Sequence, residues 1–316
     1  MSRADVRLSD RALPSWDGVL PPWPGEQQGG VFVRRGPQTG AEPALFVHGL
    51  GGASTNWTDL MGLLADEVDG AALDLPGFGW SEPPVGPAYP LRVHVRAVVE
   101  TIERWDRGPV HLLGNSLGGA VSTRVAARRP DLVKTLTLVS PALPNLRVSK
   151  GVDPRLALLA VPGLAQLVTR RLAATTPEQR VRAVLELCYG DPREIQPERA
   201  AEAVEEFTRR RGLAHSQEAL TLSLKGLVAT YFERGPRNLW EQARSVQAET
   251  LIVWGTADRL VSVRVAPRAL AAFPHSRLLV LPGVGHVAQM ERPETVARAF
   301  LALKEDAEPH RATDPR

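Results

Sequence analysis

The chain has 316 residues, of which 43% are hydrophobic and 23% are charged, and its formal net charge at pH 7 is only +3. These values are typical of a globular protein with a large core, and they do not indicate a nucleic-acid-binding surface. The apolar run at 156–168 is too short for stable insertion into a membrane, and no apolar stretch typical of a signal peptide follows the N-terminus. The only cysteine, Cys188, allows no internal disulfide, so we expect a reducing, cytoplasmic location.

The first 30 residues contain four prolines and no sustained hydrophobic period. They predict an N-terminal extension that lies over the domain or is partly disordered. From residue 31 onward, short apolar runs alternate with amphipathic stretches. Strands are expected at 31–35, 44–47, 71–75, from 110 and at 136–140, and helices at 56–68, 91–105 and 117–129. This alternation predicts βαβ units and a mostly parallel central sheet flanked by helices.

The alternation stops after Pro141 and resumes at residue 246. In between, no strand-like run occurs, and helices are expected at 154–173, 177–188, 197–211, 214–232 and 236–245. Strands at 250–254 and 277–281, helices near 262–272 and at 293–304, and a disordered tail at 305–316 complete the chain. The predicted organisation is an α/β core, residues 31–140 and 246–304, with an inserted all-helical lid at 141–245.

One segment, Gly114-Asn115-Ser116-Leu117-Gly118, lies where an apolar strand meets a helix. It matches the G-x-S-x-G pattern of a nucleophile elbow, in which a sharp strand-to-helix turn exposes the serine hydroxyl. The turn presses together the residues two before and two after the serine, so glycine is needed at both places. The backbone N–H of Leu117 then lies at a helix N-terminus, where a developing anion is stabilised. We therefore predict that Ser116 is a catalytic nucleophile.

A serine nucleophile needs a general base, and the base needs an acid that orients it. In a parallel sheet such groups lie on loops at the carboxyl ends of strands. Asp258 follows the strand expected at 250–254, and His286 follows the next strand along the chain. The stretch at 141–145 offers no competing carboxylate. We predict that Asp258, His286 and Ser116 form a catalytic triad.

These motifs resemble those of the lidded α/β-hydrolase superfamily. Beside the elbow and the segments that end in Asp258 and His286, the resemblance is carried by His48-Gly49 and by Asp74-x-Pro-Gly-Phe-Gly-x-Ser81. It implies an α/β-hydrolase fold and a second oxyanion donor at the backbone N–H of Leu50, beside that of Leu117. The serine nucleophile argues against the branches of the haloalkane dehalogenases and epoxide hydrolases. We expect His48 to shape the oxyanion loop and Asp74 to brace it.

The leading hypothesis is a serine hydrolase that acts on a carboxylic ester or a related small acyl compound. Neither a metal nor a nucleotide cofactor is expected, because the chain has no P-loop, G-x-G-x-x-G after a strand, H-E-x-x-H or C-x-x-C. The segments around Asn115 and from His286 to Gln289 also resemble the meta-cleavage-product hydrolases, which cleave a carbon–carbon bond, although Val287 replaces the tryptophan expected there. A non-catalytic ligand-binding protein of this fold is the other alternative.

Four residues are candidates for the substrate pocket, namely Trp57, Asn115, Leu159 and Val287. Leu159 lies in the run at 156–168, which is apolar nearly all round and would be buried on more than one side if it were helical. A hydrophobic acyl pocket follows if this run covers the nucleophile. The sequence predicts no particular oligomeric state.

Overall fold

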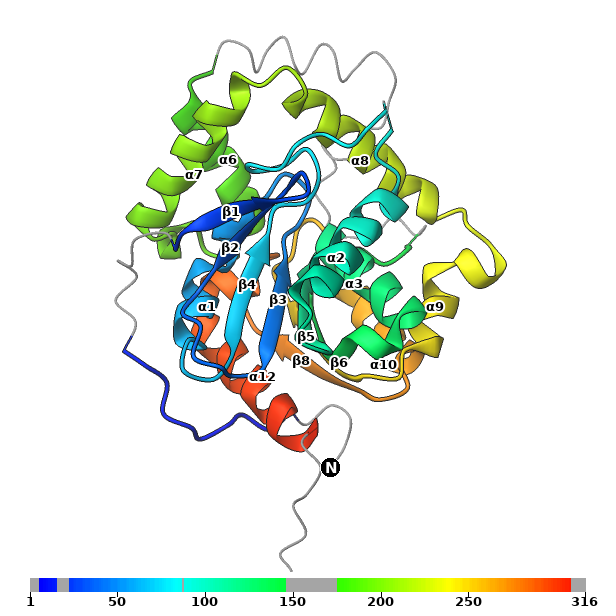
Figure 1. Ribbon diagram of the computed structural model, residues 1–316. Coiled ribbons are helices and arrows are strands. Elements are labelled where there is room, and N and C mark those ends of the chain that lie inside the picture. Colours follow the sequence, from blue (N-terminus) through cyan, green and yellow to red (C-terminus); the bar gives the residue numbers. More distant parts are fainter. Residues whose placement is uncertain (1–5, 16–22, 87, 146–174, 308–316) are drawn as a thin grey trace, which may run out of the picture.

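The structure is a computed structural model that describes residues 6–15, 23–86, 88–145 and 175–307. An eight-stranded sheet forms its centre, in the order β1-β2-β4-β3-β5-β6-β7-β8 (Figure 1). The strands are β1 Gly25–Gln28, β2 Val31–Arg35, β3 Pro43–Val47, β4 Asp69–Leu73, β5 Val110–Asn115, β6 Val133–Val139, β7 Glu249–Gly255 and β8 Ser276–Leu281. The pairs β1–β2 and β2–β4 are antiparallel, and all the other pairs are parallel. The predicted mostly parallel sheet is confirmed.

The two faces of the sheet are covered by different helices. On one face lie α2 Leu91–Trp105, α3 Leu117–Arg128, α9 Leu239–Ser245 and α10 Ala266–Ala272, and on the other lie α1 Thr58–Leu63, α11 Ala288–Glu291 and α12 Pro293–Ala307. Successive side chains of β3 alternate between the two layers, with Leu45 and Val47 in one cluster and Ala44 and Phe46 in the other. Because both faces are covered, the middle strands are apolar throughout rather than in alternation.

The ends of several elements differ from the sequence prediction. Strand β1 lies inside the predicted N-terminal extension, because its residues Gly25-Glu-Gln-Gln28 are mostly exposed at the sheet edge and give no hydrophobic pattern. The helix expected at 56–68 is a 3-10 turn, Ser54–Trp57, followed by the short α1. Helix α12 runs to Ala307, so the first three residues of the predicted disordered tail are helical.

The insertion between β6 and β7 contains α6 Pro177–Cys188, α7 Pro197–Arg211 and α8 Ser216–Thr230, grouped at the upper end of Figure 1. The helix expected at 154–173, with Leu159, lies outside the described residues. Helix α9 packs instead into the core, where Leu239 and Trp240 are buried. The predicted boundary of the insertion at 245 stays a prediction.

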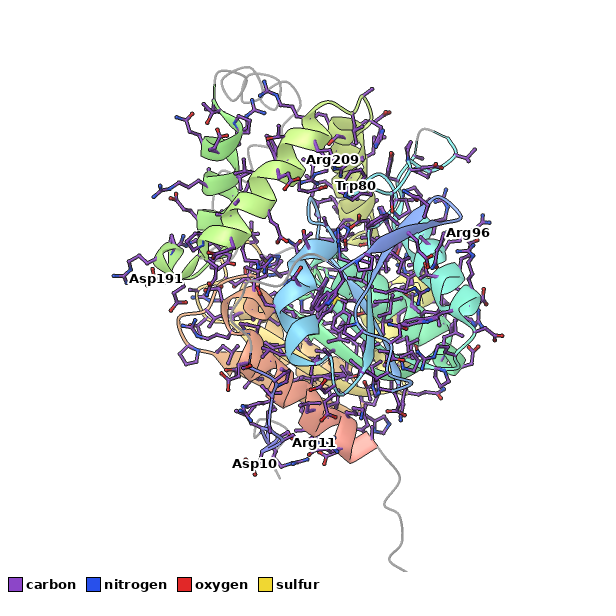
Figure 2. All side chains as sticks on the ribbon, turned by 60° about the vertical axis from the view of Figure 1, so that its left-hand side comes forward. Asp10, Arg11, Trp80, Arg96, Asp191 and Arg209 are labelled. Atoms are coloured by element: carbon purple, nitrogen blue, oxygen red, sulfur yellow. The ribbon has the colours of Figure 1, made fainter. Side chains whose placement is uncertain are left out.

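Helix α7 is fastened to the core by three arginines. Arg199 forms an ion pair with Asp59 of α1, with 3.2 Å between Nε and Oδ1. Arg209 stacks on the ring of Trp80, 3.9 Å from the ring centroid, as Figure 2 shows. Arg210 donates from Nη1 to the carbonyl oxygen of Gly51 over 2.9 Å. The insertion is thus held to α1 and to the loops that follow β3 and β4.

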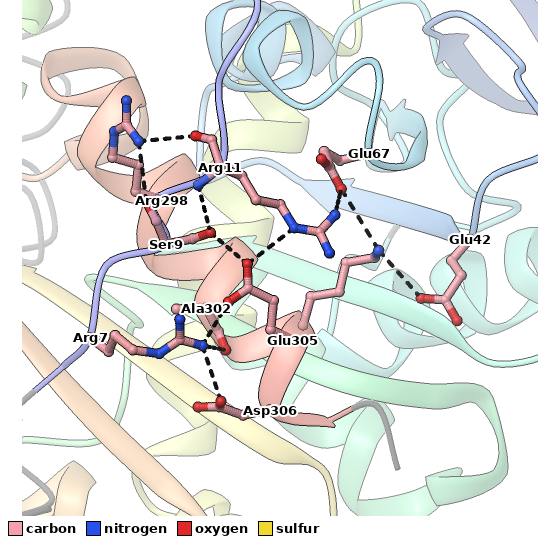
Figure 3. A network of polar contacts seen from close by, with 10 residues as sticks. Arg7, Ser9, Arg11, Glu42, Glu67, Arg298, Ala302, Glu305 and Asp306 are labelled. Carbon is pink, nitrogen blue, oxygen red and sulfur yellow. Dashed lines mark hydrogen bonds and ion pairs between the residues drawn. The ribbon is translucent and has the colours of Figure 1, made fainter. Parts of the chain in front are cut away.

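Residues 6–15 lie along α12, at the opposite end of the molecule from α7. The backbone N–H of Ser9 donates to the carbonyl oxygen of Arg298 over 3.0 Å, and Arg7 pairs with Glu305 at 2.7 Å. Figure 3 shows Arg7 and Glu305 within a wider polar network that also includes Ser9, Arg11 and Arg298. Residues 6–15 therefore lie over the domain, which is one of the two alternatives predicted for the N-terminal extension.

Candidate active site

Ser116 occupies a strained turn between β5 and α3. Its backbone has φ 53° and ψ −114°, a conformation that costs a residue with a side chain about 1–3 kcal/mol. Neighbouring segments hold it there: the Ser116 N–H donates to Val139 O over 3.0 Å, and the Ser116 carbonyl accepts from Ala120 and Ala142. Strain that is fixed from both sides in this way is typical of functional positions.

The two glycines of the elbow are required by close approaches of the backbone. A Cβ atom added to Gly114 would lie 2.5 Å from the carbonyl oxygen of Gly118. A Cβ atom added to Gly118 would lie 2.2 Å from the carbonyl oxygen of Val47, the last residue of β3. The elbow is therefore pressed against the end of β3, for the steric reason that the sequence pattern suggests.

Asp258 and His286 form a buried pair at the ends of β7 and β8. Their Oδ2 and Nδ1 atoms are 2.9 Å apart, and Oδ1 of Asp258 accepts from the backbone N–H groups of Leu260 and Val261, each at 2.9 Å. Burial alone would raise the pKa of Asp258, but the charge and hydrogen bond of His286 and these two N–H groups hold that pKa below its ordinary value. An ionised Asp258 fixes the proton of His286 on Nδ1 and leaves Nε2 as the basic nitrogen.

Asn115 connects the elbow to the histidine loop. Its Nδ2 donates to the carbonyl oxygens of both Val139 and His286, each over 3.1 Å. This brings the residue beside Ser116 against the backbone of His286. The Ser116 hydroxyl and the His286 ring are not hydrogen-bonded to each other here, a contact that often shortens only when a substrate binds. The structure therefore gives Asn115 a bracing position between the two loops.

The loop after β3 presents a backbone N–H group close to Ser116. The carbonyl oxygen of Gly49 is held by Nδ1 of His48 at 2.7 Å and by the N–H of Gly52 at 3.1 Å. Because a trans peptide directs its C=O and N–H to opposite sides, the N–H of Leu50 points away from these partners. A Cβ atom added to Gly49 would lie 3.1 Å from Cβ of Ser116, so this peptide lies beside the serine.

His48 and Asp74 are buried and support this loop. Nε2 of His48 accepts from the N–H of Leu75 over 2.9 Å, and burial lowers the pKa of His48 to about 4, so its ring is neutral at pH 7. Asp74 accepts from the N–H groups of Ser54 at 2.6 Å and Trp80 at 2.8 Å. Burial raises the pKa of Asp74 despite these bonds. Both residues are positioned to shape loops, as the sequence suggested.

The structure places the other predicted pocket residues as follows. Trp57 is fully buried and packs on Phe46, with the ring centroids 5.4 Å apart, so core packing accounts for it. Val287 packs in a small apolar cluster with Leu185 and Tyr189 of the insertion. Leu159 lies outside the described residues. A role of these residues in a substrate pocket stays a prediction.

Sequence reasoning missed two groups beside the site. Arg210 binds the loop after β3 at Gly51, and Glu291 accepts from the N–H groups of Gly190 and Gly285. Both contacts join a side chain to backbone atoms far away in the sequence, and such contacts leave no local pattern. The sequence indicated the loop that contains Gly285 only because His286 directly follows that glycine.

Among residues 6–15, 23–86, 88–145 and 175–307, no group of three or more His, Cys, Asp or Glu side chains is arranged to hold a metal ion. Within the same ranges, no helix has the length and the apolar character needed to cross a membrane.

Three sequence relatives each align with most of this chain. A protein from Pseudomonas putida, the dihydrolipoyllysine-residue acetyltransferase component of an acetoin cleaving system, is 30% identical over 84% of this chain. The chain spans 64% of the length of that relative and 64% of the corresponding protein from Cupriavidus necator. Lipase 3 of Moraxella sp. is 25% identical, with 96% of this chain and 86% of the lipase covered.

Solved structures of hydrolases share the fold of this chain. The 2-hydroxy-6-oxo-6-phenylhexa-2,4-dienoate hydrolase from Rhodococcus sp. strain RHA1 superposes with a TM-score of 0.69 at 21% identity, covering 87% of this chain and 94% of that one. At this identity, the likeness concerns the fold alone. A model of the family described as alpha/beta hydrolase fold matches residues 43–293. The chain therefore belongs to the α/β-hydrolase fold family.

Proposed function

We propose that the protein is a serine hydrolase that cleaves a carboxylic ester or a related acyl compound through Ser116, His286 and Asp258. The observation that carries this proposal is the 2.9 Å contact between Asp258 and His286, on a loop that Asn115 joins to the strained Ser116 turn. A nucleophile beside a base that a third group orients is the arrangement that serine catalysis needs.

The chemistry follows from the positions of these groups. Nε2 of His286 takes the proton of the Ser116 hydroxyl as Oγ attacks the carbonyl carbon of the substrate. The N–H groups of Leu50 and Leu117 stabilise the oxyanion that forms. His286 then gives its proton to the leaving alkoxide, and an acyl-enzyme remains. Water, activated by the same histidine, releases the acid and restores the serine.

The helical insertion is proposed to act as a lid over this site. Arg210 of α7 donates to Gly51 of the oxyanion loop at 2.9 Å. At the end of α6, the carbonyl oxygen of Cys188 accepts from the N–H of His286 at 2.6 Å. The insertion thus contacts two of the loops on which the proposed reaction depends, those after β3 and β8.

The rate of ester hydrolysis, measured between about pH 5 and 8, is expected to rise once with pH, as catalysis by a single general base requires. Only the neutral ring of His286 accepts the serine proton. His48 is already neutral throughout this range, because its pKa is lowered to about 4, and the lowered pKa of Asp258 keeps that carboxylate charged. The measurement is kcat/KM for an ester under acylation-limited conditions. A flat profile would mean that no such base acts.

For p-nitrophenyl esters, kcat/KM is expected to rise from acetate to a medium-chain optimum and then to fall. Leu220 of α8 lies beside the oxyanion loop, since its Cδ1 would be 3.4 Å from a Cβ atom added to Gly51. Each methylene buried against such a side chain contributes up to about 0.8 kcal/mol, or roughly fourfold in rate. Leu220→Asp is expected to flatten the rise. The same result is expected for Leu159→Asp, whose position lies outside the described residues.

A matched control for the acyl-chain experiment is Val228→Asp, two turns further along α8. Val228 and Leu220 are similarly exposed, at 43% and 37%, so a general effect of a new charge on this helix appears equally in both variants. Acetate as the best substrate of the wild-type protein would contradict an apolar acyl site. An equal response of the two variants would assign the effect to the helix rather than to Leu220.

Hydrolysis of a carbon–carbon bond is the second candidate function. The segments Gly114–Gly119 and His286–Gln289 support it, because they resemble those of meta-cleavage-product hydrolases, while Val287 departs from that pattern. A direct comparison of p-nitrophenyl butyrate with a vinylogous 1,5-diketone acid separates the two. Much faster cleavage of the diketone acid would favour the second candidate over the ester hydrolase.

A further inference from the structure

The carboxylate of Glu291 joins two segments that are far apart in the sequence. Glu291 ends the short helix α11, and the residue is only 7% exposed. Its Oε1 accepts from the N–H of Gly285 over 2.7 Å, and its Oε2 accepts from the N–H of Gly190 over 2.9 Å. Gly285 directly precedes His286, and Gly190 follows α6 of the insertion. One buried side chain therefore fixes the histidine loop and the end of the insertion together.

The two segments are also in direct contact. The N–H of His286 donates to the carbonyl oxygen of Cys188 over 2.6 Å. A Cβ atom added to Gly190 would lie 1.9 Å from the carbonyl oxygen of Gly283, and one added to Gly285 would lie 2.2 Å from that of Cys188. Backbone lies on backbone here, with no room for a side chain. A displacement of either segment is therefore transmitted to the other.

We propose that Glu291 is a positioning residue that holds His286 in place through the N–H of Gly285 and ties that position to the insertion through the N–H of Gly190. The proposal rests on His286 being the general base of the proposed function. Glu291 does not touch the substrate in this account. It sets where the imidazole stands relative to Ser116, and an error of about 1 Å in such a geometry costs on the order of a hundredfold in rate.

Glu291→Gln is the most informative change. Glutamine has nearly the same shape, but it carries one acceptor oxygen and one NH₂ group. It can therefore accept from one of the two N–H groups, while its NH₂ group faces the other N–H, and two donors repel each other. We expect kcat to fall by roughly 10- to 100-fold. We expect KM to stay within about threefold, because substrate binding does not use this carboxylate.

The rate must be expressed per working active site. A fluorophosphonate that reacts with the nucleophile counts these sites, and kcat is divided by that count. Glu294→Gln is the matched control, because Glu294 lies exposed on α12, where it pairs with Arg298 at 3.1 Å, and it should leave kcat per site unchanged. If Glu291→Gln only reduces the number of sites, with a normal kcat per site, the residue is merely structural and the proposal fails.

Gly190→Ala provides an independent test of the link to the insertion. The new methyl group meets Gly283 and pushes the segment away from the histidine loop, so the same loss of kcat per site is expected. In the double variant with Glu291→Gln, the losses should not multiply, because both changes break one connection. Multiplying losses, or a normal kcat per site in Gly190→Ala, would overturn the coupling. Should Ser116→Ala retain activity, the proposed function itself is wrong, which is a different result.

Discussion

Ser116→Ala is expected to lower ester turnover by about a millionfold, the loss typical of removing a triad nucleophile. The reason is chemical, since no other hydroxyl occupies the strained turn between β5 and α3 in the described part of the chain. The fold should persist, because the turn is held by backbone bonds to Val139, Ala120 and Ala142 rather than by the serine side chain. The measurement is kcat for a p-nitrophenyl ester, together with the melting temperature.

The matched control for this experiment is Ser122→Ala. Ser122 lies further along α3, is fully buried, and its hydroxyl has no hydrogen-bond partner among the described residues. It should keep wild-type turnover. If purified Ser116→Ala protein keeps more than a few per cent of the activity, the assignment of the nucleophile is wrong.

Asp258→Asn is expected to lower turnover roughly ten-thousandfold. The asparagine NH₂ group would face Nδ1 of His286 and force the ring proton onto Nε2, the nitrogen that must accept the serine proton. The carboxylate oxygen that accepts from Leu260 and Val261 can be replaced by the amide oxygen, so the loop should keep its shape. The measurement is kcat per folded protein at a pH where the wild-type rate is maximal.

Asp74→Asn is the control that decides which carboxylate acts. Asp74 is also buried, but its partners are the N–H groups of Ser54 and Trp80 in two loops. Its replacement should therefore lower thermal stability more than it lowers turnover in the protein that stays folded. If Asp74→Asn proves far more damaging to turnover than Asp258→Asn, the acid has been wrongly assigned.

The parts of this protein that were predictable from the sequence are those with a local cause. The middle strands are apolar because helices cover both faces of the sheet, and α6 and α7 match their expected ranges because Pro177 and Pro197 lie in their first turns. The elbow was predictable because a turn of this kind leaves no room for a Cβ atom at the positions of its two glycines. His286 and Asp258 followed from their places at the ends of strands.

The parts that were not predictable depend on contacts between distant segments. Strand β1 has mostly exposed polar residues, and only its pairing with β2 makes it a strand. Helix α9 has the local pattern of the insertion helices, yet Leu239 and Trp240 pack into the core. Glu291 meets Gly190 across 101 residues of sequence. No local period or motif encodes such contacts.

The arrangement of the site explains why the fold and the proposed chemistry depend on each other. The loops after β3, β5, β7 and β8 each contribute one part, and hydrogen bonds between side chains and backbone atoms hold several of them to their neighbours. Asn115 joins two of them, and the insertion contacts two through Arg210 and Cys188. The proposed site is therefore preorganised, which is what stabilisation of a short-lived oxyanion requires.

The most direct test is to expose the folded protein to a fluorophosphonate probe and to locate the adduct by peptide mass spectrometry. This account predicts one adduct, on Ser116, with activity lost in proportion to labelling and with no adduct in Ser116→Ala. Folded wild-type protein that remains unlabelled would contradict it and would favour a ligand-binding protein. An adduct on another residue that abolishes activity would contradict the assignment of Ser116.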